Sequence, residues 1–126
     1  MKVLQIINTA YRATIEEQDD TVVWLTHAMT GAGGDFDVLL AGNAVNYTVE
    51  RQDAAGLSFG DWRQTQPPRL GHDVAGLIGK HVRVYVVDED VREIGLTAVT
   101  QVDGFTRIAR AELADLFDQY DQIWRW

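Results

Sequence analysis

Three short, largely apolar runs, at residues 3–7, 37–41 and 82–87, constrain the fold of this chain more than any other feature. The first two are rich in valine, leucine and isoleucine without a period-two alternation, which is typical of strands buried on both faces. Segments with helical spacing separate the runs. Because parallel strands need crossover connections, and those crossovers are right-handed, this alternation predicts a parallel sheet with helices on both faces. We therefore expect a three-layer α/β/α fold with a mostly parallel sheet of about five strands.

The first connection carries the pattern of a helix start. Thr14 with Glu17 has capping-box spacing, in which each side chain satisfies a free backbone N–H of the other residue. Apolar residues of one helical face continue from Ile15 to Met29, and glycines within 31–34 predict the helix end.

The rest of the chain predicts alternating elements of lower regularity. A helix is expected over 45–55, followed by an irregular loop at 58–69, and loops of that length are usually functional or mobile. The later elements are a helix at 73–78, an acidic turn and short helix closed by Gly95, a fourth strand near 99–102, an amphipathic helix marked by Leu113, Leu116, Phe117 and Tyr120, and a last strand at 121–126.

Length and charge narrow the class of protein. A chain of 126 residues fits one domain, which we place at residues 1–126. The net charge is −8, and the eleven cations form no cluster. A nucleic-acid binder needs a basic face that displaces phosphate counterions, so we expect no nucleic-acid partner. No apolar run approaches the roughly 18–20 residues that cross a bilayer, and no signal-peptide layout is present. We therefore expect a cytoplasmic protein without a membrane partner.

The sequence contains no cysteine. This absence excludes disulfides, thiolate metal sites and the carriage of sulfur as a persulfide on the chain itself. No histidine pair has the spacing of a metal site, and no glycine-rich phosphate loop follows a strand. The sequence therefore predicts no metal, no cofactor and no catalytic residue, and it favours a protein that is not an enzyme.

Two segments carry a family resemblance. Residues 84–91 followed by Gly95-Leu96 look like the DsrH/TusB segment in which a strand runs into an acidic turn, and residues 120–126 are similar to that family's closing strand with its terminal tryptophan. With the general pattern of the N-terminal half, the chain resembles the DsrE/DsrF/DsrH group of sulfur-relay proteins, which includes TusB, TusC and TusD. The resemblance extends over nearly the whole chain.

The resemblance implies a function and locates a departure. Sulfur-carrying members hold a cysteine near the end of this strand, at a position that corresponds to Val87, and Ile94 replaces the usual arginine. Other members lack the cysteine and act as non-carrier subunits. The resemblance thus implies a non-catalytic subunit or scaffold in a sulfur-relay-type assembly. Family members form trimers and hexamers, which implies a homo-oligomer or DsrE-like partner subunits.

The ends of the predicted strands suggest an alternative function. Open parallel sheets bind ligands at the carboxyl ends of their strands. The polar residues that we expect there are Asn8, Tyr11, Arg12, Asn43 and Asp88. They could form a crevice for a small ligand or for an enzymatic reaction, with the long loop as a cover. The pattern favours the other interpretation, that they are ordinary turn residues, since Asn, Asp and Gly suit turns for backbone reasons. A flavodoxin-like or receiver-type domain is a weaker third alternative, because the first strand is not followed by acids.

Two further clusters invite a functional interpretation. The carboxylates of Asp88, Glu89, Asp90 and Glu93 could hold a hard cation, but Asp90 and Glu93 have capping-box spacing, so the pattern favours helix capping. Tryptophan is enriched at interface hot spots, and we place Trp62, Trp124 and Trp126 at a candidate interface. The last two share one face of the final strand, so they could instead pack on their own domain.

Overall fold

A parallel β-sheet forms the centre of the structure, a computed structural model that describes residues 1–12, 20–52 and 55–126. The described residues contribute five strands to this sheet: β1 (Lys2–Ile7), β2 (Asp35–Leu40), β5 (Val84–Val87), β6 (Thr106–Ile108) and β7 (Gln122–Arg125). The strand order is β6-β5-β2-β1-β7, and every neighbouring pair is parallel. This arrangement confirms the predicted α/β fold with a parallel sheet of about five strands.

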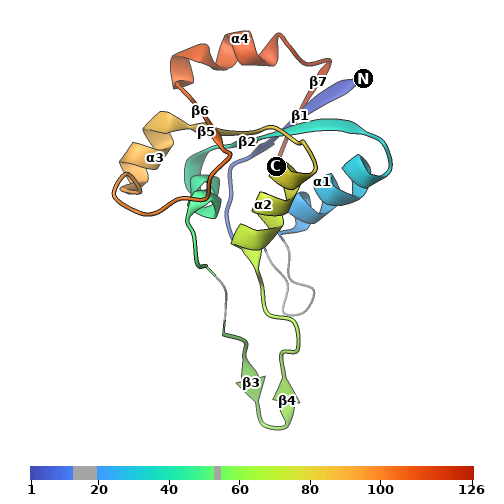
Figure 1. Cartoon of the computed structure of the whole chain (residues 1–126), viewed down its shortest axis with the longest axis vertical. Helices are drawn as coiled ribbons and strands as arrows, with labels where there is room; N and C mark the ends of the chain where they lie inside the picture. Colours follow the sequence, from blue (N-terminus) through green and yellow to red (C-terminus); the bar gives the residue numbers. More distant parts are fainter. Residues whose placement is uncertain (13–19, 53–54) are drawn as a thin grey trace.

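Helices cover both faces of the sheet (Figure 1): α1 (Thr21–Gly31), α2 (Leu70–Gly79), α3 (Asp88–Ile94) and α4 (Leu113–Phe117), together with the 3₁₀ turns η1 (Gly42–Thr48) and η2 (Arg110–Glu112). The strands β1, β2, β5 and β6 follow one another in one direction, so right-handed crossovers place α1, α2 and α3 on one face. The step from β6 back to β7 runs in the opposite direction, which places α4 on the other face. No helix within the described ranges is long and apolar enough to span a membrane.

The core consists of two apolar clusters, one on each face of the sheet. The larger cluster lies under α1 and α2 and includes Val38 and Leu40, whereas the smaller one lies under α4 and includes Leu39 of the same strand. Successive strand residues point to opposite faces, and these three are all buried. Burial on both sides is the reason that the strand has no period-two alternation.

Two helix ends show how local sequence sets the element boundaries. Asp20 caps α1 by accepting hydrogen bonds from the backbone N–H groups of Val22 and Val23, at 2.9 and 3.2 Å. The capping box predicted at residues 14–17 lies outside the described residues. Gly95 ends α3 in the left-handed region with φ 87°, where glycine carries no Cβ penalty, and this confirms the predicted end of that helix.

Residues 58–69 were wrongly predicted to be an irregular loop over the strand ends. Ser58–Phe59 (β3) and Trp62–Arg63 (β4) pair as an antiparallel hairpin, which projects away from the sheet at the bottom of Figure 1. Strands of two residues are too short to show a period-two pattern, so the sequence contains no signal for them. We call residues 55–69 the arm.

Two further predicted elements are displaced. The helix expected over 45–55 is the 3₁₀ turn η1, which ends at Thr48 because Val49 adopts an extended conformation. The strand expected near 99–102 lies instead at Thr106–Ile108, and Gln101 makes only an isolated bridge with Val49. The true strand, β6, forms an edge of the sheet, where residues such as Arg107 remain exposed and give no apolar run.

A buried carboxylate joins β2 to the C-terminal segment of the chain. Asp37 is 3 % exposed, and its carboxylate accepts hydrogen bonds from the backbone N–H and Nε of Arg83 at 2.9 and 3.0 Å and from the Tyr120 hydroxyl at 2.6 Å. Lys2 Nζ lies 3.6 Å from the same carboxylate. Burial, followed by the hydrogen bond to Asp37, raises the pKa of Tyr120. The sequence offers no sign of this network, whose members are far apart in the chain.

Candidate functional site

The carboxyl ends of the parallel strands define the edge at which such sheets bind ligands. The connections that follow β1, β2 and β5 lie on the face of α1 and α2, whereas β6 is followed by η2 and α4 on the opposite face. The direction of the connections therefore changes between β5 and β6. In this topology the carboxyl ends of these two strands form the switch point, which is the expected place for a site.

Asp88 stands at this switch point as the first residue of α3. It pairs with Arg92 one helical turn later, and its Oδ1 accepts a hydrogen bond from Arg107 Nη1 of β6 at 3.0 Å. The hydrogen bonds from Arg92 and Arg107 hold the pKa of Asp88 below its ordinary value, and pairing with Asp88 raises the pKa of Arg92. Both carboxylate oxygens of Asp88 are thus occupied by cations of its own chain.

The next two acids are engaged in the same way by Arg110 of η2. Glu89 accepts a hydrogen bond from the Arg110 backbone N–H at 2.8 Å, which lowers the pKa of Glu89. Asp90 pairs with the Arg110 guanidinium through one oxygen and accepts the Gly42 backbone N–H at 2.7 Å through the other. Across the switch point, Asp88 and Asp90 are therefore ion-paired with three arginines, and Glu89 accepts a backbone N–H.

This arrangement corrects the predicted capping box. The helix begins at Asp88 with Val87 as its N-cap, so Asp90 lies inside the first turn and does not cap it. The acids still occupy the first turn, where the helix dipole favours negative charge. Among the described residues, no three carboxylate or imidazole side chains come together in a way that could hold a metal ion.

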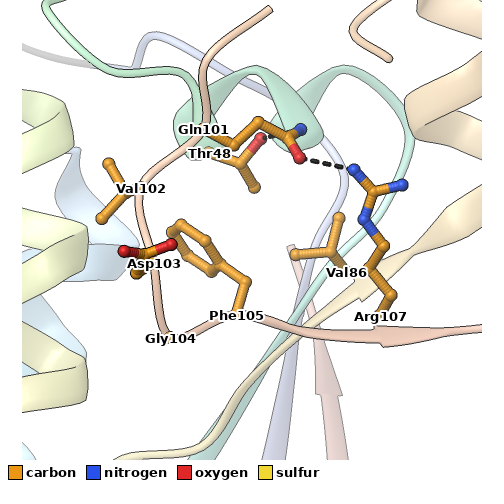
Figure 2. A pocket seen from close by; sticks show the side chains of 8 residues that line it. All are labelled: Thr48, Val86, Gln101, Val102, Asp103, Gly104, Phe105 and Arg107. Carbon is orange, nitrogen blue, oxygen red and sulfur yellow. Dashed lines mark hydrogen bonds between the residues drawn. The ribbon is translucent and has the colours of Figure 1, made fainter. Parts of the chain in front are cut away.

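A pocket of about 170 Å³, which we call the strand-end pocket, opens beside this network on the face of α1 and α2 (Figure 2). Its lining residues are Thr48, Val86, Gln101, Val102, Asp103, Gly104, Phe105 and Arg107. Arg107 Nη2 donates to Gln101 Oε1 at 2.6 Å, and Gln101 Nε2 donates to the Thr48 hydroxyl at 2.9 Å. These polar groups bind one another, so the pocket has an apolar floor and a fixed polar rim.

Val87, which the sequence resemblance matches to the cysteine of sulfur-carrying proteins, is buried on the other face of the sheet. Its side chain is 1 % exposed and belongs to the cluster under α4. Its neighbour Val86, which pairs with Arg107, lines the pocket instead. A side chain at position 87 therefore contacts the core and has no access to solvent in this conformation.

The five residues predicted at a strand-end crevice are spread along the edge of the sheet: Asn8, Tyr11, Arg12, Asn43 and Asp88. Within the described residues, none of them lines the strand-end pocket, and only Asp88 contacts it indirectly through Arg107. The Tyr11 hydroxyl instead donates to Gln52 at 2.6 Å, at the base of the arm. The predicted crevice formed by these five residues therefore stays a prediction.

A buried tyrosine that the sequence did not single out fixes the segment after β1. The Tyr47 hydroxyl donates to Asp20 at 2.5 Å and accepts the Tyr11 backbone N–H, also at 2.5 Å. Tyr11 adopts a positive φ of 63°, and its ring packs edge-on against Tyr47. Burial is the main cause that raises the pKa of Tyr47, and the hydrogen bond to Asp20 adds to it. This network is structural, because its groups are all satisfied internally.

The three tryptophans of the candidate interface have different surroundings. Trp124 packs edge-on against Phe36 with ring centroids 5.5 Å apart, and Trp126 Nε1 donates to the buried amide of Gln5 at 3.0 Å. Both contacts are with their own chain, on one face of β7, as the alternation of strand residues requires. Trp62 lies on the arm, where it is 39 % exposed and stacks on Phe59.

Comparison with known proteins identifies the fold. No protein-family model matches the sequence, and no curated protein matches it either. Among solved structures, the ychN protein from E. coli is similar over 99 % of this chain and 98 % of its own, with a TM-score of 0.72 and 15 % sequence identity. A protein of unknown function, MTH1491 from Methanobacterium thermoautotrophicum, covers the same shares with a TM-score of 0.62 and 14 % identity. At this identity the likeness shows the fold alone, and the chain therefore shares the α/β fold of these two proteins.

Proposed function

We propose that this chain is a single-domain, cytoplasmic DsrE-like protein that acts as a non-catalytic subunit or scaffold in a sulfur-relay-type oligomeric assembly. The observation that carries the proposal is the buried valine at position 87. A sulfur carrier needs a reactive thiolate that a donor and an acceptor can both reach. This chain has the strand and the helix that would present such a group, but an apolar side chain in the core replaces the nucleophile.

The charges beside this position support the same conclusion. The first turn of α3 holds three carboxylates that are already paired with arginines or backbone N–H groups. A persulfide anion placed next to them would meet negative charge without a free cation. The network is better suited to fixing the β5–β6 edge as a rigid surface than to handling an anionic intermediate.

The partner in this proposal is a second copy of the chain, in a trimer or hexamer, or a DsrE-like partner subunit. Exposed aromatic residues on the arm support an assembly, because tryptophan contributes strongly to interface energies. Native mass spectrometry over a range of concentrations tests it, and a monomer under all conditions would count against the proposal. Affinity purification from the native cell should recover sulfurtransferase components, whereas their consistent absence would contradict a role in sulfur relay.

The strand-end pocket favours a second candidate function, the binding of a small ligand. Its Arg107–Gln101–Thr48 rim presents fixed polar groups over an apolar floor, a combination that is typical of ligand sites. Thermal-shift screening with nucleotides, flavins and sulfur compounds tests this alternative. A stabilising ligand whose effect disappears in Gln101→Leu would support it, and the absence of any hit would remove its basis.

A further inference from the structure

A second pocket, of about 330 Å³, lies at the base of the arm and differs from the strand-end pocket in its charges. Its lining includes Arg51 from the leg that leaves η1, and Arg69 and His72 from the leg that enters α2. Glu50 is the acid in this lining, which therefore contains two arginines and one carboxylate. Since the chain carries a net charge of −8, a cationic pocket is a departure from its general surface.

The two arginines here lack the internal partners that the other pocket provides. At the switch point, Arg92, Arg107 and Arg110 are each paired with an acid. By contrast, neither Arg51 nor Arg69 has an ion-pair partner in the part of the chain that the structure describes. Two arginines that line one pocket without ion-pair partners leave their guanidinium groups available, so an anion in the pocket would be stabilised by both.

Hydrogen bonds hold the backbone around Arg51 in place. Gln52, the residue after Arg51, donates to the carbonyl groups of Asn46 and Val49 at 2.6 and 2.8 Å, and it accepts the hydroxyl of Tyr11. Arg51 itself adopts a positive φ of 59°, a conformation that side chains rarely take and that is often found at ligand sites. The segment 50–52 that precedes the arm is therefore fixed relative to β1 and η1, which is the preorganisation that a binding site needs.

The second leg is fixed by the start of α2. Arg69 is the N-cap residue of this ten-residue helix and makes no side-chain cap hydrogen bond, while the next residue, Leu70, is buried in the core. Gly71, which lines the pocket, lies in the first turn, whose N–H groups carry the positive end of the helix dipole. The His72 imidazole in the same lining can donate a further hydrogen bond.

We propose that the arm-base pocket is a binding site for a tetrahedral oxyanion, held between Arg51 and Arg69 with His72 as an additional donor. Each guanidinium group can bind phosphate or a related oxyanion with two parallel hydrogen bonds. Two arginines therefore suit an anion with several oxygens, such as a tetrahedral oxyanion, better than a single carboxylate. The pocket is larger than such an ion, so the oxyanion can belong to a small organic phosphate. This pocket adjoins the strand-end pocket at Val102, which lines both, but its charged residues are its own, and the proposal does not depend on the scaffold role.

Titration calorimetry at constant ionic strength tests the site with three probes: inorganic phosphate, thiosulfate and glycerol 3-phosphate. We expect saturable binding of at least one probe, and about tenfold weaker binding in Arg51→Gln and in Arg69→Gln, since each variant loses one charged hydrogen-bonding group. Arg63→Gln is the matched control, because Arg63 is an exposed arginine of the same arm that does not line the pocket. It should bind as the wild type does.

Two results would overturn the proposal. One is the absence of saturable binding by every probe up to about 10 mM, a concentration beyond which affinity is negligible. The other is an equal loss in Arg63→Gln, which would indicate non-specific attraction to the arm. Thermal unfolding of each variant checks that the fold is intact. Tighter binding of glycerol 3-phosphate than of phosphate would identify an organic phosphate as the ligand, and equal binding would identify the free oxyanion.

Discussion

Replacement of Asp37 by asparagine should lower the free energy of unfolding by about 2–4 kcal/mol. The substitution keeps the size of the side chain but removes its charge and turns one of its two acceptor atoms into a donor. Oδ1 accepts the backbone N–H of Arg83, and Oδ2 accepts Arg83 Nε and the Tyr120 hydroxyl. An amide can serve only one of these positions, so a buried donor loses its partner in either orientation.

The magnitude follows from the exposure of the partners. A lost hydrogen bond to a charged acceptor costs about 1.5–3 kcal/mol, and an orphaned buried donor costs about 1–3 kcal/mol. The roughly 3–5 kcal/mol of a fully buried broken ion pair is not reached, because the Arg83 and Lys2 side chains are 47 % and 31 % exposed and remain hydrated. For a chain of this length each kcal/mol corresponds to roughly 3–5 °C, so Tm should fall by roughly 6–20 °C.

Chemical denaturation at pH 7, followed by circular dichroism, measures this loss. Asp35→Asn is the matched control, since it removes the same charge from an exposed position of the same strand and should change stability by less than about 0.5 kcal/mol. A cycle with Tyr120→Phe should give a coupling of about 1 kcal/mol or more, because the two groups share a hydrogen bond. If Asp37→Asn is as mild as Asp35→Asn, the buried network does not stabilise the fold and the reasoning is refuted.

Alkaline pH should destabilise the protein, because burial raises the pKa values of Tyr47 and Tyr120 above their ordinary 10.0. Above that pH the unfolded chain loses these protons before the folded one does, so the free energy of unfolding falls as pH rises. The variant Tyr47→Phe should show a smaller fall of this free energy in denaturation curves measured at pH 8–11. The thiol of Val87→Cys should react with a thiol reagent and a persulfide donor far more slowly than that of Ile94→Cys, because Val87 is buried and Ile94 is exposed. Equal reaction rates would show that the strand end opens. Trp62→Ser should weaken self-association in analytical ultracentrifugation while Tm stays constant, and unchanged association would exclude the arm from the interface.

Much of the sheet could be predicted because its central strands are buried on both faces. Residues such as Val38, Leu39 and Val86 are each 1 % exposed, so selection for burial acts on every position and leaves a continuous apolar run. The edge strand β6 carries no such run, since Thr106 and Arg107 face solvent. The prediction therefore placed the fourth strand at the nearest apolar residues, several positions too early.

The partners at the site could not be predicted for a different reason. Asp88 was identified from its place after a strand, but its ion-pair partner Arg107 is 19 residues further along the chain. Similarly, Tyr47 is 27 residues from Asp20, to which it donates a hydrogen bond. These pairs are created by the strand order β6-β5-β2 and by the packing of η1, and neither has a local signature. A period or a motif describes neighbours in the sequence, whereas the charges of this site meet only after the sheet has formed.

The distribution of charge distinguishes the switch point from the arm base, two regions that topology alone would suggest equally as anion sites. Both the switch point and the arm base lie near helix starts, which favour anions. At the switch point the chain supplies its own carboxylates to α3 and pairs each one, so an incoming anion would have to displace Asp88 from Arg107. At the arm base, neither Arg51 nor Arg69 forms an ion pair among the described residues, although Glu50 lies in the same lining. An anion that displaces a bound carboxylate must break the hydrogen bonds that the carboxylate already makes, whereas an anion that binds a guanidinium without an ion-pair partner breaks none. The charge distribution therefore favours the arm base over the switch point as a place for an anion.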